Sequence, residues 1–393
     1  MRMMRKNSSV LLATSALGLI TSFSGLSIGL SRAAETPAKP SMPVNHLLFT
    51  TSQHCMACHS NIKGPGGEDI SIGFSWRPTM MANSGRDPYW MAGVRRESTD
   101  HPTAKAAIED ECSICHMPMA RFESKAAGQE GEVFSHLPPN PKKESDRLAA
   151  DGVSCSVCHQ IENEKLGTRE SFVGRFKIDV TRRKGDRRVY GPYEIDKGHT
   201  HIMNSSSTFV PTEGKHIRSS ELCATCHTLL TQALDAQGKV IGELPEQVPY
   251  QEWLHSDYKE TKSCQSCHMP VVEQEVAITS VMGKLRPEMG RHVFIGGNFF
   301  MQRVLNKYRK ELAVGAQPAE LEAAAARTIE HLQTQTAKVG ITQVAVSGGR
   351  LQADITIENG SGHKFPTAYP SRRAWLHVTV KDSRGGEIGR AHV

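Results

Sequence analysis

A single five-residue pattern accounts for every cysteine in this chain. The pattern is Cys-x-x-Cys-His, and its five copies, at residues 55–59, 112–116, 155–159, 223–227 and 264–268, contain all 10 cysteines of the 393 residues. We call these copies motifs 1 to 5, in chain order. A histidine directly follows each cysteine pair. The chain must therefore fold so that, at each of the five motifs, two thiols and one imidazole face one common group.

Cys-x-x-Cys-His is the sequence to which a c-type haem is attached. The two thiols bond to the edge of the porphyrin, and the adjacent imidazole binds the iron as the proximal ligand. Redox disulfides and zinc sites also use paired cysteines, but neither needs a histidine after every pair. The pattern therefore predicts five haem c groups and favours electron transfer. The predicted attachment residues are Cys55, Cys58, Cys112, Cys115, Cys155, Cys158, Cys223, Cys226, Cys264 and Cys267, and the predicted proximal ligands are His59, His116, His159, His227 and His268.

The composition fits a core built largely from porphyrin. Hydrophobic residues make up 38% and aromatic residues 6% of the chain, which is low for a protein of this length that packs only its own side chains. Glycine and proline clusters such as G-P-G-G at residues 64–67 divide the motif region into loops and short helices. We expect a mainly α-helix and loop fold, organised by haem as in multihaem cytochromes c, with a small C-terminal β domain.

The first 33 residues have the features of a secretory signal peptide. Arg2, Arg5 and Lys6 precede an uncharged run at residues 10–30, and Ser31-Arg32-Ala33 offers small residues for cleavage. An uncleaved membrane anchor is the alternative, because the run is about long enough to span a bilayer. Cleavage would leave no stable membrane span and would place the protein in the periplasm or outside the cell.

Cleavage also changes the charge balance of the chain. The formal net charge falls from +6 to +2 when the four basic residues of the signal peptide are removed. Each haem adds two propionates, so the basic sequence does not indicate nucleic-acid binding. The basic run T-R-R-K-G-D-R-R at residues 181–188 is either a solvated loop or a docking patch for an acidic partner.

The remaining chain divides into four predicted segments. Residues 34–45 are proline-rich and predict a flexible tether, and residues 46–298 hold the pentahaem cytochrome domain. Residues 299–337 predict helices, one of them starting at Pro318. Residues 338–393 predict a β-hairpin around Gly348-Gly349 followed by a further strand and turn. Because two or three strands are marginal alone, this β region must pack on the haem region or is incomplete.

The thirteen other histidines are enough to give every haem a second, distal imidazole, which keeps haem potentials low. The first candidates lie on loops near the motifs, and we expect them to bind a haem other than the one nearest in sequence. They are His199, His201, His216, His255 and His292. His46, His54, His101 and His136 form a second group, and His363 is either a ligand or a turn-stabilising residue. The rival ligands, methionines such as Met80 and Met119, are mostly expected to pack against porphyrin.

Several segments resemble a known protein group. They are S-E-L-C-A-T-C-H-T-L-L (220–230), P-E-Q-V-P-Y-Q-E-W-L-H-S-D-Y (245–258), S-C-Q-S-C-H-M-P (263–270), H-V-F-I-G-G-N-F-F-M (292–301) and G-H-K-F-P-T-A-Y-P-S-R-R-A-W-L-H (362–377). The chain is similar to exported multihaem cytochromes c of the group that includes the nitrification tetrahaem cytochrome and hydroxylamine oxidoreductase. In that group the β region usually continues further, which again predicts that it is incomplete here.

The resemblance implies an electron carrier whose partners are other cytochromes or a quinol-linked donor. The alternative is an enzyme that oxidises or reduces a small nitrogen or sulfur compound at one haem with an open face. No Cys-x-x-Cys-Lys motif, which marks the active haem of one nitrite-reducing family, occurs in the chain. The oligomeric state is left open.

Overall fold

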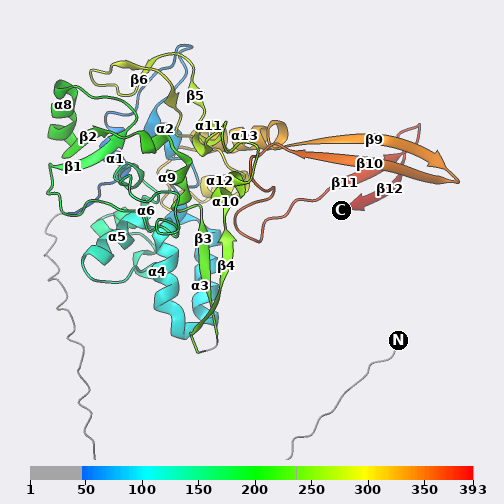
Figure 1. Ribbon diagram of the computed structural model, residues 1–393, viewed down its shortest axis with the longest axis horizontal. Coiled ribbons are helices and arrows are strands. Elements are labelled where there is room, and N and C mark those ends of the chain that lie inside the picture. Colours follow the sequence, from blue (N-terminus) through cyan, green and yellow to red (C-terminus); the bar gives the residue numbers. More distant parts are fainter. Residues whose placement is uncertain (1–46, 236, 393) are drawn as a thin grey trace, which may run out of the picture. The chain divides into compact units, whose positions relative to one another are not determined.

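The structure, a computed structural model, describes residues 47–235 and 237–392. The predicted signal peptide, the predicted tether and His46 therefore lie outside the described residues. The described residues form one compact unit. Short helices joined by loops build most of it, as the dense glycine and proline punctuation predicts, and every strand belongs to a two-stranded sheet (Figure 1).

The α-helices before motif 4 range from 4 to 13 residues, and the longest, α3, begins with a side-chain cap and a proline. Asp87 caps α3, accepting hydrogen bonds from the backbone of Tyr89 (2.8 Å) and Trp90 (3.4 Å), and Pro88 occupies its first turn. These helices are α1 (Ser52–Met56), α2 (Ile72–Trp76), α3 (Pro88–Asp100), α4 (Lys105–His116), α5 (Pro118–Ala126), α6 (Glu144–Ala150), α7 (Cys155–Cys158) and α8 (Lys197–Ser207).

The later helices include the predicted helical segment. They are α9 (Ser220–Ala224), α10 (Pro249–Leu254), α11 (Cys264–His268), α12 (Phe299–Lys307) and α13 (Pro318–Thr334). Helix α13 begins at Pro318 as predicted, and Leu321 on it and Leu305 on α12 are both fully buried where the two helices pack. Glu320 closes a capping box with Gln317 and also accepts from the Arg77 guanidinium, Nε to Oε2 2.6 Å, which ties α13 to the end of α2.

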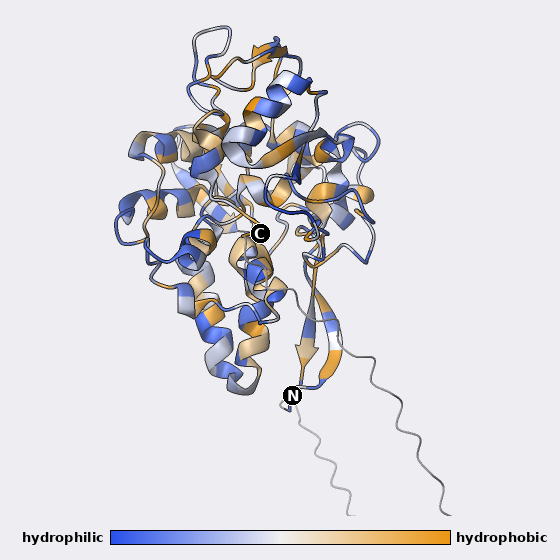
Figure 2. Cartoon of the chain, turned by 90° about the vertical axis from the view of Figure 1, so that its left-hand side faces the viewer, coloured by the Kyte–Doolittle hydropathy of each residue, from blue (hydrophilic) through white to orange (hydrophobic). Residues whose placement is uncertain are grey.

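The apolar core of the described residues is divided rather than continuous. The largest cluster holds Leu48, Met119, Val133, Leu148 and Val157, and three smaller clusters lie apart from it. The helices carry hydrophilic and hydrophobic residues along their length (Figure 2). Among the described helices none has the length and apolar character that crossing a membrane requires. A divided core is what we expect if additional apolar groups lie between the clusters.

Six two-stranded sheets complete the fold. The first pair, β1 and β2, is parallel, and the other five are antiparallel. The strands are β1 (Arg187–Gly191), β2 (Phe209–Glu213), β3 (Leu229–Leu234), β4 (Val240–Gln247), β5 (Val271–Val272), β6 (Val276–Ala277), β7 (Leu285–Arg286), β8 (Met289–Gly290), β9 (Ala337–Ser347), β10 (Arg350–Asn359), β11 (His377–Lys381) and β12 (Glu387–His392).

The C-terminal strands confirm the predicted hairpin and the predicted strand and turn. Of the two alternatives for this region, packing on the haem region or an incomplete β region, the hairpin does not show the first. Strands β9 and β10 extend from the end of α13 away from the helices (Figure 1). Ile341 is 67% exposed and Val346 75% exposed, so their apolar side chains do not rest on the motif region. The segment that does contact the helical part is the loop between β10 and β11.

Candidate functional site

Each motif lies on or directly after a short helix. Motif 2 ends α4, motif 5 spans α11, and motif 3 spans α7 and the residue after it, whereas motifs 1 and 4 begin in the last two residues of α1 and α9 and continue in the turn that follows. Within one helical turn, positions i, i+3 and i+4 share a face, so the two thiols and the imidazole of each motif point to the same side. The local pattern thus presents a Cys, Cys, His face at each motif, as the sequence predicts.

Four of the five proximal histidines are held by a backbone carbonyl from another part of the chain. In each case ring Nδ1–H donates to the carbonyl, which leaves Nε2 as the nitrogen with a free lone pair. The pairs are His59 with Ile278 (2.7 Å), His116 with Ser84 (3.1 Å), His159 with Tyr190 (2.5 Å) and His268 with Ile295. Metal-bound histidines are held in this way, since the second hydrogen bond fixes the tautomer and the ring orientation.

Burial also favours the neutral imidazole that iron binding needs. Desolvation lowers the pKa of His116 and of His227 to about 4, and it lowers the pKa of His59, His159 and His268 as well. The ring of His227 is nevertheless exposed by its accessible surface. This combination fits a group such as haem lying against the motif.

The cysteines are unpaired and lie in the same kind of environment. Nine are half-buried and Cys267 is exposed. Burial raises the pKa of Cys112 to about 12 and that of Cys158 to about 11, so these two thiols stay protonated. None of the ten forms a disulfide, so all of them are available for thioether bonds.

Contacts between thiols show which motifs are neighbours. The thiol of Cys155 lies close enough to that of Cys55 to lower its pKa, and the thiols of Cys115 and Cys264 raise the pKa of Cys226 and Cys223 in the same way. Motif 1 therefore lies beside motif 3, motif 2 beside motif 4, and motif 4 beside motif 5. Cys158 of motif 3 is also close enough to Cys223 and Cys226 to raise their pKa. The five motifs converge into one cluster, in an order that differs from the order along the chain.

Two proximal histidines face a second histidine across a gap that fits an iron atom. The ring centroids of His159 and His292 are 6.3 Å apart with planes at 18°, and those of His268 and His363 are 6.3 Å apart at 9°. Two metal–imidazole bonds of about 2.0–2.1 Å through one metal separate ring centroids by about 6.4 Å, once half a ring is added at each end. Both pairs therefore have the spacing of axial ligands.

The two opposing histidines are also held in the ligand orientation. His292 Nδ1–H donates to the Gly290 carbonyl (3.0 Å), and His363 Nδ1–H donates to the Lys364 carbonyl (2.9 Å). Burial lowers the pKa of His292 to about 3. Although motif 5 is nearer to His292 in sequence, its ring faces His159 of motif 3. This placement matches the expected pattern, and that a distal histidine serves a haem other than its nearest one stays a prediction.

The other predicted distal ligands are placed differently. His199 uses both ring nitrogens, to Asp196 (2.8 Å) and to the Met282 carbonyl (2.8 Å). Buried His216 donates from Nε2 to the Ile161 carbonyl (2.9 Å). To bind iron through Nε2, each would have to give up a hydrogen bond. His201 is exposed on α8, and His255 is exposed after α10 with Nδ1 bound to the Gln251 carbonyl (2.7 Å). The structure brings none of these four rings opposite a proximal ring.

The sequence is consistent with two roles for His363, a haem ligand or a turn-stabilising residue. The one signal that pointed to it is its place in the G-H-K-F-P segment, which the resemblance includes. Of the second group, His54 and His101 are exposed, whereas His136 is buried and donates to Asp146 (2.8 Å). A carboxylate-held imidazole is also an arrangement that metal ligands use.

The residues fit haem better than a bare metal ion. Within residues 47–235 and 237–392, no group of three or more His, Cys, Asp or Glu side chains is arranged to hold a metal. Iron in a porphyrin needs only two protein ligands, which the two histidine pairs supply.

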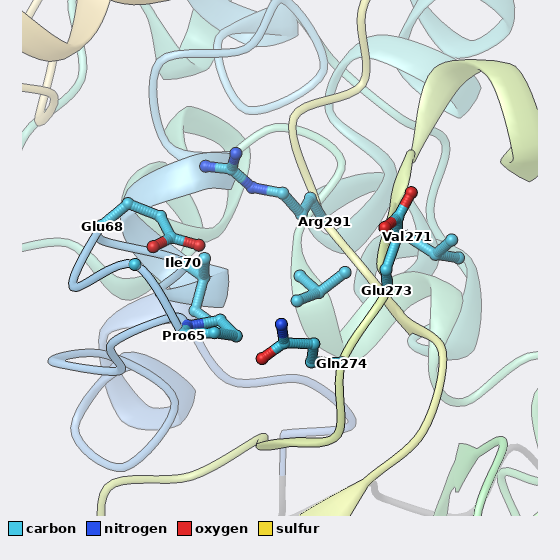
Figure 3. A pocket seen from close by; sticks show the side chains of 9 residues that line it. Pro65, Glu68, Ile70, Val271, Glu273, Gln274 and Arg291 are labelled. Atoms are coloured by element: carbon cyan, nitrogen blue, oxygen red, sulfur yellow. The ribbon is translucent and has the colours of Figure 1, made fainter.

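An open depression of about 340 Å³ is lined by none of these paired histidines (Figure 3). It is lined by Pro65, Glu68, Ile70, Glu273 and Arg291 among others. Its carboxylates and guanidinium are of mixed charge, and no predicted site residue lines it. It is therefore separate from the candidate site, although Arg291 precedes His292.

Comparisons with known proteins support the fold. No protein-family model matches the chain, and no curated protein matches it. Among solved structures, the fold is similar to that of a penta-heme cytochrome c552 from Thermochromatium tepidum, with a TM-score of 0.52 and 18% sequence identity over 87% of this chain and 74% of that one. The chain thus has a fold similar to that of a multihaem cytochrome c.

Proposed function

We propose that this protein is a pentahaem c-type cytochrome that carries electrons in the periplasm or at the cell surface. The observation that carries the proposal is the combination of five Cys-x-x-Cys-His motifs with two histidine pairs at axial-ligand spacing. The fold similarity to a penta-heme cytochrome supports it. Redox proteins, such as other cytochromes or a quinol-linked donor, are the proposed partners.

Bound haem would supply one-electron iron chemistry. The residues of the chain would determine where each haem is attached and which ligands its iron has. The thiols of each motif would attach the group, and the proximal Nε2 would bind its iron. Carbonyls such as those of Ile278 and Tyr190 hold the tautomer and the orientation of the imidazoles. His292, opposite His159, would close the sixth position of the motif 3 haem, which leaves no room there for a substrate.

The thiol contacts support a branched electron path. Motif 4 lies beside motifs 2 and 5 and close to motif 3, which in turn lies beside motif 1. Haems attached at these motifs would be in close contact, and the haem of motif 4 would be the junction.

The decisive experiment combines mass and redox measurements on the exported protein. We expect the intact mass of the processed chain plus five haems, and a redox titration with overlapping one-electron steps at low potential. Adding nitrite, hydroxylamine or tetrathionate to the reduced protein should cause at most slow, non-saturable reoxidation. Fewer than five haems would overturn the count. Saturable turnover together with a high-spin ferric signal would replace the carrier with an enzyme.

A variant at His292 tests the proposed closed haem of motif 3. His292→Met should raise the potential of one haem and leave four unchanged, because a thioether ligand stabilises ferrous iron. His201→Met is the matched control, since His201 is exposed on α8. Equal titration curves for both variants would contradict the assignment of His292.

A further inference from the structure

The loop between β10 and β11 is fastened to the helical part of the protein. Glu252 on α10 accepts hydrogen bonds from the Lys364 backbone (3.0 Å) and from the Thr367 hydroxyl (2.6 Å) through one carboxylate oxygen. Gly362, at φ +72°, lies so close to Tyr258 that an added Cβ would be 2.8 Å from its ring. Further along, the Tyr89 hydroxyl donates to Ser371 (3.2 Å). We call residues 360–371 the strap.

His363 lies between two of these contacts. Its ring is the one that faces His268 of motif 5, 6.3 Å between centroids with planes 9° apart. Gly362 accounts for the position, because its left-handed φ and missing Cβ let the backbone approach Tyr258 closely. The strap therefore delivers an imidazole to the far side of the motif 5 site.

The turn itself does not need the imidazole of His363. The turn is closed through the His363 carbonyl, which accepts from Asn359 Nδ2 (2.7 Å) and Ser361 Oγ (2.9 Å). The ring's own hydrogen bond is to the carbonyl of the next residue, Lys364. This bond fixes the tautomer and leaves the lone pair of Nε2 for a metal. A turn-stabilising role, the alternative for this residue, would instead use the side chain in the turn.

We propose that His363 is the sixth ligand of the haem at motif 5 and that the strap, held by Glu252, keeps this haem closed. The inference rests on the proposed function, since it presupposes a haem attached at Cys264 and Cys267. It assigns the ligand to the C-terminal part of the chain rather than to the pentahaem region. The fastening of a surface loop thereby decides whether one iron can take an external ligand.

The test uses the full chain with its haems. In His363→Ala, one haem in five should become high-spin by ferric EPR, and the reduced protein should bind one more equivalent of carbon monoxide than the wild type. Added imidazole should restore the low-spin state. Glu252→Ala should give a fractional form of the same change, because the strap loses two hydrogen bonds. His363→Met keeps a ligand in place, so it should fold and raise the potential of one haem only.

His331 provides the matched control. It lies on α13 near the pair of His268 and His363. Its pKa is lowered mainly by burial and to a smaller extent by His363. His331→Ala should leave all haems low-spin. If His363→Ala keeps five low-spin haems, or if the high-spin signal appears in His331→Ala instead, the assignment is wrong while the proposed carrier function stands. A wild type without haem at motif 5 would overturn both.

Discussion

Asp146 is a buried carboxylate whose replacement should be costly. Its side chain is 5% exposed, and it accepts hydrogen bonds from His136 Nδ1 (2.8 Å), from Lys143 Nζ (3.0 Å) and from the Asn140 backbone (3.2 Å). Burial alone would raise the pKa of Asp146, but the hydrogen bonds from His136 and Lys143 outweigh it and the pKa is lowered. The carboxylate therefore stays charged and fastens the segment that leads into motif 3.

The structure sets the size of the effect. Removing one partner of a buried pair leaves the other polar group unsatisfied and costs about 3–5 kcal/mol, which we expect for Asp146→Ala. Asp146→Asn keeps the shape and one acceptor oxygen but loses the charge, so we expect about 2 kcal/mol. The control Asp100→Asn removes a pair with Arg96 in which Asp100 is 42% exposed. Exposed pairs contribute about 0.2–1 kcal/mol.

Urea unfolding of the haem-loaded protein, followed by far-UV circular dichroism, measures these differences. With a slope of about 3 kcal/mol per molar urea, Asp146→Ala should lower the midpoint by roughly 1–1.7 M. Because the folded pKa of Asp146 is lowered, its contribution is present above the unfolded pKa and is lost as the pH falls towards the folded one. The gap between wild type and Asp146→Asn should therefore shrink in acid. A cost for Asp146→Asn no larger than that of Asp100→Asn would refute the reasoning.

Three further outcomes are expected. Leu321→Ala should lower the free energy of unfolding in urea by about 2–5 kcal/mol, because Leu321 is fully buried between α12 and α13. The control Leu285→Ala should change it by about 0.5 kcal/mol or less, because Leu285 is 64% exposed. Equal losses for the two variants would contradict the packing. His199 lowers the pKa of Asp196, and Asp196 raises the pKa of His199. The link between α8 and Met282 should therefore weaken as the pH falls through the lowered pKa of Asp196, and also as the pH rises through the raised pKa of His199. Hydrogen exchange in residues 279–285 should be slowest between these two pH limits, and Asp196→Asn should make it less dependent on pH. N-terminal sequencing of the exported protein should begin near Ala34, and a mature chain that starts at Met1 in the membrane fraction would show an uncleaved anchor instead.

The sequence alone predicted several features that depend on neighbours along the chain, although not the β3–β4 hairpin. The five motifs name ten cysteines and five proximal histidines, and an i, i+3, i+4 pattern places each set on one helical face wherever the helix lies. The helix that starts at Pro318 and the hairpin at Gly348-Gly349 were predictable for the same reason, since a proline start and strict alternation act locally.

Only the tertiary structure decided which histidine faces which motif. An imidazole close in sequence to a motif cannot reach the opposite side of the group bound there, so the facing ring must come from a distant segment. His292 faces His159 rather than His268, and His363 reaches His268 because the strap is fastened at Glu252. His199 resembles these residues in the sequence, but its ring nitrogens are used by Asp196 and Met282. Hydrogen bonds between distant parts of the chain, which no local pattern encodes, determine which Nε2 is left free to meet a metal.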